Sequence, residues 1–332
     1  GTSWISREIQ KAILKIRIKG LGKEHRTAIF PKLIFTLKRG LNLQPGDPNY
    51  DIKQLALECS TKRMYPDLLM YDKIKEITGS FKTPMGCRSF LQGWKDPETG
   101  KEVNSGRMNL GVVTVNLPRI ALEAQGDKEL FWQIFQEKMN ICHTALKYRI
   151  ARTKQAKPEN APLLYMYGAF GKRLKRTDSV DEVFKNSRAT ISLGYIGLYE
   201  VCTTFYGSNW EHNKEAHDFA VSIAKAMHEL CAKWESEEGY HYSLYSTPAE
   251  SLTDTFCQDD LKKFGRIEDV TDKEYYTNSF HYDVRKHPTP FEKLEFEEAF
   301  PYQAAGGFIH YCEYPNLRQN PKALEAVWDW AY

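Results

Sequence analysis

Short apolar runs with strand character alternate along this chain with longer segments whose apolar residues recur at helical spacing. The clearest strand is predicted over residues 110–117, LGVVTVNL, which is rich in β-branched residues and is followed by Pro118. Strands separated by helices of ten or more residues need crossover connections, and crossovers favour parallel pairing. The sequence therefore predicts an α/β fold, a sheet or barrel whose working face lies at the carboxyl ends of its strands.

The same patterns place the other elements. Ser246 and Thr247 are N-cap residue types and Pro248 suits a first helical turn, so a helix is expected to begin there. No internal repeat or low-complexity stretch interrupts the alternation. Further strands are expected at 29–37, 190–195, 240–245 and 307–311, and helices at 51–78, from about 120, and at 128–154, 197–205 and 213–237.

Charge and hydropathy exclude several classes of protein. Lys and Arg total 46 against 43 for Asp and Glu, a formal net charge of +3, with no asymmetry of charge sign that would indicate a nucleic-acid or membrane partner. No apolar run reaches the roughly 18 residues of a membrane-spanning helix, and the N-terminus lacks the order of a signal peptide. We expect a cytoplasmic protein.

The cysteines and histidines do not have metal-site spacing. Seven cysteines occur without a C-x-x-C pair, and no two histidines are four residues apart on a helix. An odd cysteine count in a cytoplasmic protein also argues against a disulfide framework. We therefore expect no metal site and mostly buried, inert thiols, with one possible exception.

That exception is Cys87, in the segment TPMGCRSF at residues 83–90. Pro84 restricts the backbone before it, and Gly86 permits an unusual backbone angle. The pair could present the thiol at the tip of a tight hairpin. An ordinary turn that happens to contain a cysteine is the alternative.

Several blocks of the sequence carry a resemblance. The blocks PMGCRSF, GRMNLGVVTVNLPRIALE (106–123), SLGYIGLYE (192–200), YSTPAES (245–251) and AGGFIHYCEYPN (305–316) resemble, in order and spacing, the anaerobic, glycyl-radical class of ribonucleotide reductases. The resemblance implies that residues 1–332 are a single catalytic segment, the C-terminal part of a ten-stranded α/β barrel. It also implies a central finger loop at about residues 80–92, with Cys87 as the site of a transient thiyl radical.

The implied reaction converts ribonucleoside triphosphates to deoxyribonucleoside triphosphates. A thiol S–H bond is close in strength to the ribose 3′ C–H bond, so a thiyl radical can abstract that hydrogen reversibly. The resemblance places Met85 beside the thiol and lets Asn109 bind formate or substrate hydroxyls, which favours formate as the reductant. A gap-filling methionine and a strand-capping asparagine are the alternatives.

Substrate phosphates need hydrogen-bond donors. Hydroxyls and amides of Ser246, Thr247, Ala249, Glu250 and Ser251 at a helix N-terminus suit an anion, although Ser246 or Thr247 could simply cap the helix. Gly194 and Gly197 allow close approach of the backbone to substrate, or tight packing of strand against helix. Ser89, beside the radical cysteine, completes the expected substrate-binding residues.

Other features of the family have no counterpart in this sequence. The glycyl-radical motif, the four-cysteine zinc site and the ATP-binding regulatory domain are missing, and both ends look cut. We expect no cofactor bound by this segment alone. The resemblance also implies a homodimer, allosteric nucleotide control and a radical-SAM iron–sulfur activase as partner. The rival hypotheses are another glycyl-radical enzyme, such as a lyase, and a non-catalytic nucleotide-binding module.

Overall fold

The computed structural model describes residues 3–86, 88–96 and 98–332. Contacts divide the chain into two compact units. The smaller unit contains Gly1–Thr83, Pro288–Leu294 and Tyr311–Tyr332, and the larger unit contains Pro84–His287 and Glu295–His310. The expectation of a single segment over 1–332 stays a prediction.

A short parallel strand pair organises the smaller unit. Strand β1 (Ile34–Leu37) pairs with β2 (Asp67–Met70) in register from Ile34 opposite Asp67 to Leu37 opposite Met70. Lys53 is fully buried, and its Nζ donates to the carbonyl of Leu43 at 2.7 Å. The helices are α1 (Ser3–Lys19), α2 (Tyr50–Arg63), α3 (Tyr71–Thr78) and α11 (Pro321–Ala331), while α10 (Pro290–Glu297) crosses the division between the units.

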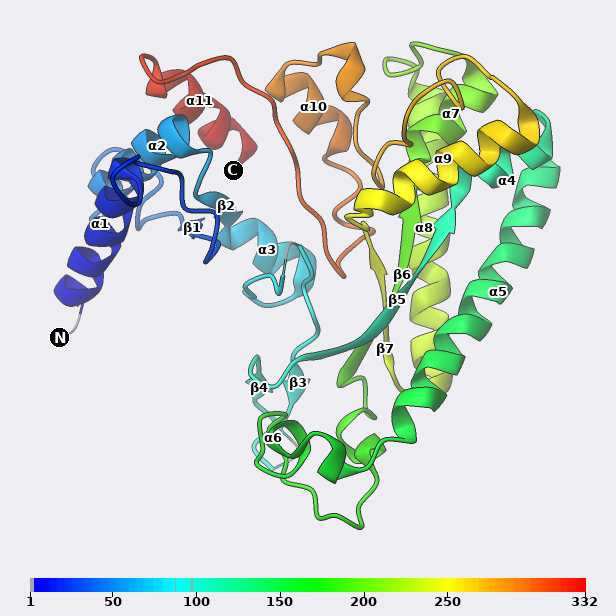
Figure 1. The fold of residues 1–332 in the computed structure, drawn as a ribbon, viewed down its shortest axis with the longest axis horizontal. Helices are drawn as coiled ribbons and strands as arrows, with labels where there is room; N and C mark the ends of the chain where they lie inside the picture. The colour runs from blue at the N-terminus through cyan, green and yellow to red at the C-terminus, as the bar shows by residue number, and fades with distance from the viewer. Residues whose placement is uncertain (1–2, 87, 97) are drawn as a thin grey trace. The chain divides into compact units, whose positions relative to one another are not determined.

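A three-stranded parallel sheet forms the centre of the larger unit (Figure 1). Its order is β5 (Met108–Asn116), β6 (Ala189–Ile196) and β7 (His241–Tyr245). Gly194 is the partner of Thr114 on one side and of Tyr245 on the other. A small antiparallel hairpin, β3 (Trp94–Lys95) with β4 (Glu102–Val103), precedes the sheet.

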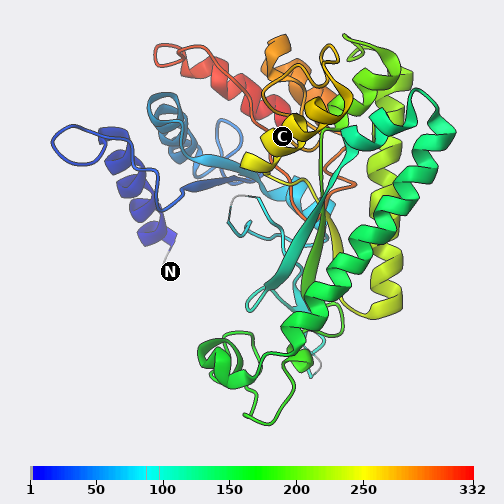
Figure 2. The same cartoon turned by 45° about the vertical axis from the view of Figure 1, so that its right-hand side comes forward.

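Long helices cover one face of this sheet. Helices α5 (Lys128–Lys154) and α8 (Lys214–Glu238) run beside the strands, and Figure 2 shows both on the same side. Helix α9 (Glu250–Phe264) lies across the upper ends of β5 and β6 in Figure 1. The remaining helices are α4 (Leu117–Ala124), α6 (Pro162–Tyr165) and α7 (Leu198–Tyr206), with short 3-10 turns at Pro158–Asn160, Val180–Val183 and Val284–Lys286.

The two faces of the sheet differ in chemistry because side chains alternate along a strand. On β6, Ile191, Leu193 and Tyr195 are fully buried in the apolar core beneath the helices. The intervening residues are small or polar, and they face the other way. We call this second surface the polar face and define it by Thr114, Thr190, Ser192, Gly194 and Ser243.

Most predicted elements of the larger unit are confirmed within one or two residues. In the smaller unit the strand expected at 29–37 is shorter, because β1 covers only Ile34–Leu37, and three other predictions are wrong. The expected helix over 51–78 is interrupted, because Met64 adopts a left-handed conformation before Pro66 and β2 follows. The expected strand at 307–311 is reduced to an isolated bridge at Gly307. The third is the start of α9, which begins at Glu250 rather than at Ser246–Pro248.

Candidate functional site

A tight hairpin brackets the cysteine that the sequence analysis singled out. The amide of Met85 donates to the Ser89 carbonyl at 2.7 Å, and the Ser89 amide donates back at 3.3 Å. Gly86 has φ +63°, the left-handed region that glycine favours. Cys87 itself lies outside the described residues. The paired positions on either side of it therefore form the hairpin that the Pro84 and Gly86 pattern predicts.

Two glycines join this hairpin to the end of β7. The Phe90 amide donates to the Gly306 carbonyl at 2.9 Å, and Gly306 donates to the Leu244 carbonyl at 3.0 Å. The Ser246 amide donates to the Gly307 carbonyl at 2.9 Å. The hairpin and the expected phosphate loop are thus both hydrogen-bonded to the dipeptide Gly306–Gly307. Sequence reasoning noted the AGGF block but missed this connection.

The segment from Ser246 to Ser251 begins with two buried hydroxyls that already have partners. Ser246 Oγ lies 3.1 Å from the hydroxyl of Tyr195. Thr247 Oγ1 donates to the Tyr245 carbonyl at 3.3 Å and lies 3.5 Å from Thr114 Oγ1. Neither side chain caps α9, so the simple capping alternative is wrong.

Helix α9 is instead preceded by Ala249, whose amide donates to Asn278 Oδ1 at 3.0 Å. Alanine has no side-chain acceptor, so the first turn of α9 has no side-chain cap from that residue. Glu250 and Ser251 are exposed in this turn. First-turn amides of a helix have no intrahelical acceptor. The Glu250 amide donates to the Pro248 carbonyl at 3.1 Å, so the amide that this exposed turn can offer to an anion is that of Ser251.

The two glycines expected near substrate serve packing in the structure. A Cβ on Gly194 would collide with the hydroxyl of Thr247 and would lie 2.8 Å from that of Thr114. Gly197 has φ +78°, and a Cβ there would collide with Cγ of Pro118 at the start of α4. These contacts support the packing alternative for both glycines, and their substrate contacts stay predictions.

Asn109 lies inside β5 rather than ahead of it, because the strand begins at Met108. Its side chain is exposed, and its Oδ1 accepts from the Gly111 amide at 2.8 Å, beside a break in register between Asn109 and Val112. The Nδ2 group is the part of the amide that this contact does not use. Met85 is 42% exposed, so it does not fill a core gap.

A buried ionic network supports the carboxyl end of β6, and no sequence motif indicated it. Lys273 Nζ donates to Glu200 and, at 2.9 Å, to Asp283. Glu200 Oε1 also accepts from the hydroxyl of Thr277 at 2.7 Å, and the Thr277 carbonyl accepts from the Gly197 amide at 2.9 Å. The network therefore fixes the turn between β6 and α7.

The other thiols have the inert character expected from the sequence. Five of the six described cysteines are buried and Cys312 is partly exposed. Burial raises the pKa of Cys142 to about 11 and that of Cys257 to about 12. These thiols are protonated at neutral pH and are poor nucleophiles. Among the described residues, no three His, Cys, Asp or Glu side chains are grouped to hold a metal ion.

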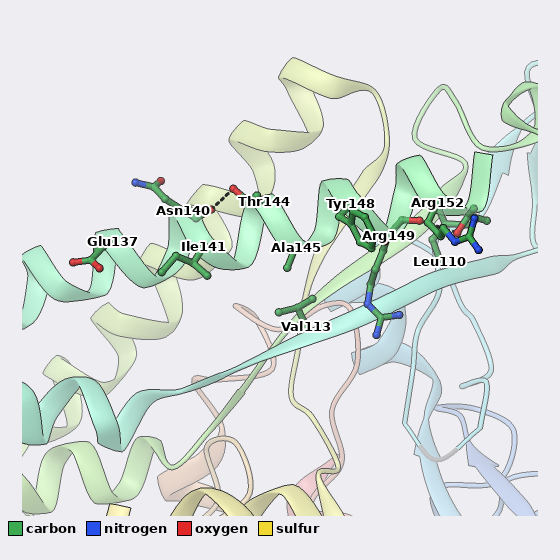
Figure 3. Close-up of a pocket in the computed structure, with 11 residues that line it drawn as sticks. Leu110, Val113, Glu137, Asn140, Ile141, Thr144, Ala145, Tyr148, Arg149 and Arg152 are labelled. Atoms are coloured by element: carbon green, nitrogen blue, oxygen red, sulfur yellow. Dashed lines mark hydrogen bonds between the residues drawn. The ribbon is translucent and has the colours of Figure 1, made fainter. Parts of the chain in front are cut away.

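A groove of about 1110 Å³ lies between α5 and β5, on the helix side of the sheet (Figure 3). Arg149 points from α5 toward β5, where Leu110 and Val113 form the floor. The polar residues of the candidate site lie on the opposite face, so the groove does not reach them. No helix in the described part of the chain has the length and apolar character needed to cross a membrane.

Comparison with known proteins gives a consistent result. Residues 2–332 match the family model described as "Anaerobic ribonucleoside-triphosphate reductase". Proteins of that name from Escherichia coli and Haemophilus influenzae are 54% and 55% identical over the full length of this chain. The one from phage T4 is 50% identical. The chain spans 47% of the two bacterial proteins and 54% of the phage protein.

Solved structures agree at the level of the fold. The anaerobic ribonucleotide reductase of Thermotoga maritima with dATP bound in its specificity site matches 98% of this chain and 49% of its own, with a TM-score of 0.64 at 20% identity. The structure of that enzyme in complex with dATP and CTP gives a TM-score of 0.60. The described strands and helices are consistent with an α/β segment of that barrel.

Proposed function

The chain belongs to the anaerobic ribonucleoside-triphosphate reductase family, and on that premise we propose that it is the substrate-binding and thiyl-bearing part of such a reductase. The observation that carries the proposal is the hairpin from Met85 to Ser89, because Gly306 and Gly307 attach it directly to the loop at Ser246. The reactive sulfur and the substrate phosphates would thereby be positioned by one rigid connection.

The proposed reaction is a net reduction of the ribose. A thiyl radical on Cys87 takes the 3′ hydrogen atom, and the 2′ C–O bond then breaks so that the hydroxyl leaves as water. Formate supplies two electrons and one proton and is oxidised to carbon dioxide. One further proton is taken from solution, so the net products are the deoxyribonucleotide, carbon dioxide and water. Cys87 finally returns its hydrogen to the 3′ carbon. A barrel interior protects these radicals from solvent.

Two residues near the proposed radical take distinct roles. The exposed thioether of Met85 can contact a sulfur radical across the hairpin. The Nδ2 group of Asn109 can donate to formate or to a ribose hydroxyl, since only its Oδ1 is used by Gly111. Both proposals rest on the family resemblance together with these positions.

Phosphate binding is proposed for the first turn of α9. Ser251 is exposed there and offers a backbone amide and a hydroxyl, whereas the Glu250 amide donates to the Pro248 carbonyl at 3.1 Å. Ser246 and Thr247 act differently from the expectation, because their hydroxyls hold the loop to Tyr195 and Thr114. They position the amides rather than reach the phosphates themselves.

The intact reductase would add what the described residues do not provide. We infer that the glycyl radical and the zinc site lie in the part of the reductase that this chain does not span. We also infer that the reductase is an allosterically controlled homodimer and that an iron–sulfur activase is its separate partner. The glycyl radical would supply the oxidising equivalent that forms the thiyl radical. We also place the reductase in the cytoplasm.

Binding of a nucleoside triphosphate by the 332-residue chain tests the proposal. We expect CTP to bind, and Ser251→Ala to weaken that binding about tenfold, the effect of one lost charge-assisted hydrogen bond of roughly 1.5 kcal/mol. Ser236→Ala, an exposed hydroxyl at the far end of α8, is the matched control. If the chain does not bind CTP but binds a small diol or acyl substrate, the result would favour a glycyl-radical lyase instead.

A further inference from the structure

Arg188, the residue directly before β6, has two guanidinium nitrogens without a hydrogen-bond acceptor. The residue is 7% exposed, and its Nε and Nη2 atoms are buried with no hydrogen-bond partner among the described residues. Burial lowers the pKa of Arg188, although arginine stays charged at neutral pH. Buried charged donors are normally paired, so this side chain indicates a missing anion.

The unused atoms share one edge of the guanidinium. Nε and Nη2 together can hold a carboxylate side-on through two parallel hydrogen bonds. Arg285 in the same unit shows this geometry, because its Nε lies 3.2 Å from Asp283 Oδ1 and its Nη2 lies 2.8 Å from Asp283 Oδ2. The bare edge of Arg188 therefore has the chemistry to hold a carboxylate group.

Two neighbours hold this guanidinium in place. It stacks on the ring of Trp94 at 4.2 Å, and the Trp94 indole donates to the Ser105 carbonyl at 3.0 Å. A Cβ on Gly171 would lie 3.1 Å from Arg188 Nη2 and 2.8 Å from the Trp94 ring. Trp94 thus covers one face of the guanidinium, and Gly171 lies beside Nη2, so the position of the side chain is fixed and only a small ligand could be accommodated at the edge.

The position in the sheet connects Arg188 with the candidate site. Arg188 is two residues before Thr190, so it lies on the polar face. The Gln92 amide donates to Thr190 Oγ1 at 3.1 Å, and Trp94 covers Arg188 two residues further on. The segment that leaves the expected finger loop therefore lies over this guanidinium.

A second arginine adds positive charge at the same end of the sheet. Arg107 directly precedes Met108, the partner of Ala189, so Arg107 and Arg188 occupy matching positions on parallel strands. Arg107 is half-buried, and burial lowers its pKa as well. Two partly desolvated cations side by side favour an anion between or beside them.

We propose that the Nε–Nη2 edge of Arg188 binds a small carboxylate of formate or acetate size on the polar face, beneath Gln92 and Trp94. The site is inferred from the contacts of Arg188, and only the assignment of formate as its natural ligand rests on the proposed function. Asn109 on β5 is the register partner of Thr190, two residues after Arg188, so the site would lie near the side chain that is proposed to bind formate.

Titration of the nitrogen-15-labelled chain with formate tests this site. We expect the Nε–Hε resonance of Arg188, identified by its loss in Arg188→Lys, to shift and to saturate with formate. Lysine keeps the charge but loses the planar edge, so the formate affinity should fall at least tenfold. Arg152→Lys is the control, since the exposed Arg152 already donates to Gln155. Gly171→Ala, which crowds Nη2, should also weaken formate binding.

Each other outcome has a definite meaning. An unshifted Arg188 resonance would show that a protein carboxylate or no ligand occupies the edge, and it would overturn the proposal. Equal shifts with formate and chloride would overturn the assignment to a carboxylate. If Arg188→Lys does not fold, the resonance of the wild-type protein and the Gly171→Ala affinity decide. CTP binding in the same samples reports on the proposed function separately.

Discussion

Single glycines decide how closely the parts of the candidate site approach one another. Gly307 has φ +152°, and a Cβ there would collide with the Arg88 carbonyl and lie 2.7 Å from the Tyr245 ring. Gly194 is crowded in the same way by two threonine hydroxyls. The close packing of the site therefore requires glycine at these two positions, because any side chain there would collide with a neighbour.

Gly307→Ala should lower the free energy of unfolding by roughly 1–3 kcal/mol, because its Cβ meets the Arg88 carbonyl and the Tyr245 ring in addition to the strain of a backbone angle that alanine avoids. Urea denaturation measures this loss. Gly239→Ala is the matched control, since Gly239 has φ +76° but nothing within 4 Å of its Cβ position. Equal losses for both variants would show that crowding beside the hairpin has no energetic weight.

The network around Asp283 makes stability depend on pH. Burial alone would raise the pKa of Asp283, but hydrogen bonds from Arg285 and the charge of Lys273 outweigh it and hold this pKa well below its usual range. A depressed carboxyl pKa contributes stability that is present above its unfolded value of about 4 and is lost as the pH falls below it.

Asp283→Asn should therefore flatten the fall in the free energy of unfolding between about pH 5 and pH 2. Urea denaturation at several pH values measures this slope. Asp218→Asn, in an exposed ion pair with Lys214, is the control and should leave the slope nearly unchanged. If Asp283→Asn leaves the slope unaltered, the network does not lower the pKa of Asp283 in the folded protein.

Among the helices and strands, the local sequence pattern was sufficient to predict the bounds of an element where the segment has one strong periodicity. Helix α5 matches the predicted range 128–154, and α8 begins one residue after its cap Asn213. The break at Met64 and the short strand β2 were missed, because DLLM fits a helical pattern as well as a strand. Pro66, two residues after the left-handed Met64, was the available signal.

Tertiary contacts account for what local patterns could not provide. Ser246 and Thr247 are good cap residues, yet their hydroxyls bind Tyr195 and Thr114 from neighbouring strands, so α9 begins later. The unpaired edge of Arg188 was equally invisible in the sequence. The expected hairpin around Cys87 was predictable because Pro84 and Gly86 act within a few residues of it.

The capping contact of α8 permits an element-level prediction. Asn213 Oδ1 accepts from the amides of Glu215 at 3.0 Å and Ala216 at 3.4 Å. Asn213→Ala should lower the free energy of unfolding by about 0.5–2 kcal/mol, whereas Asn213→Ser, which keeps an acceptor, should be close to neutral. Thermal unfolding compares the two. A similar loss in both variants would place the effect elsewhere than in the cap.

At the scale of the whole molecule, the chain is two compact units that together span about half of the bacterial relatives. The larger unit contains the hairpin, the polar face and the first turn of α9. We expect the 332-residue chain to bind nucleotide without turning it over, since the radical source is proposed for the remaining half. Formation of dCTP by the chain with activase, S-adenosylmethionine and formate would contradict this division.

We propose Cys87 as the hydrogen-abstracting residue, and turnover by the intact reductase with Cys87→Ser is the decisive measurement. An oxygen radical on serine is too costly to form, so we predict no formate-dependent dCTP while CTP still binds with unchanged affinity. Cys257→Ser, at a buried thiol whose pKa is raised to about 12, is the control and should keep turnover. Production of dCTP at the wild-type rate by Cys87→Ser would show that another residue abstracts the hydrogen.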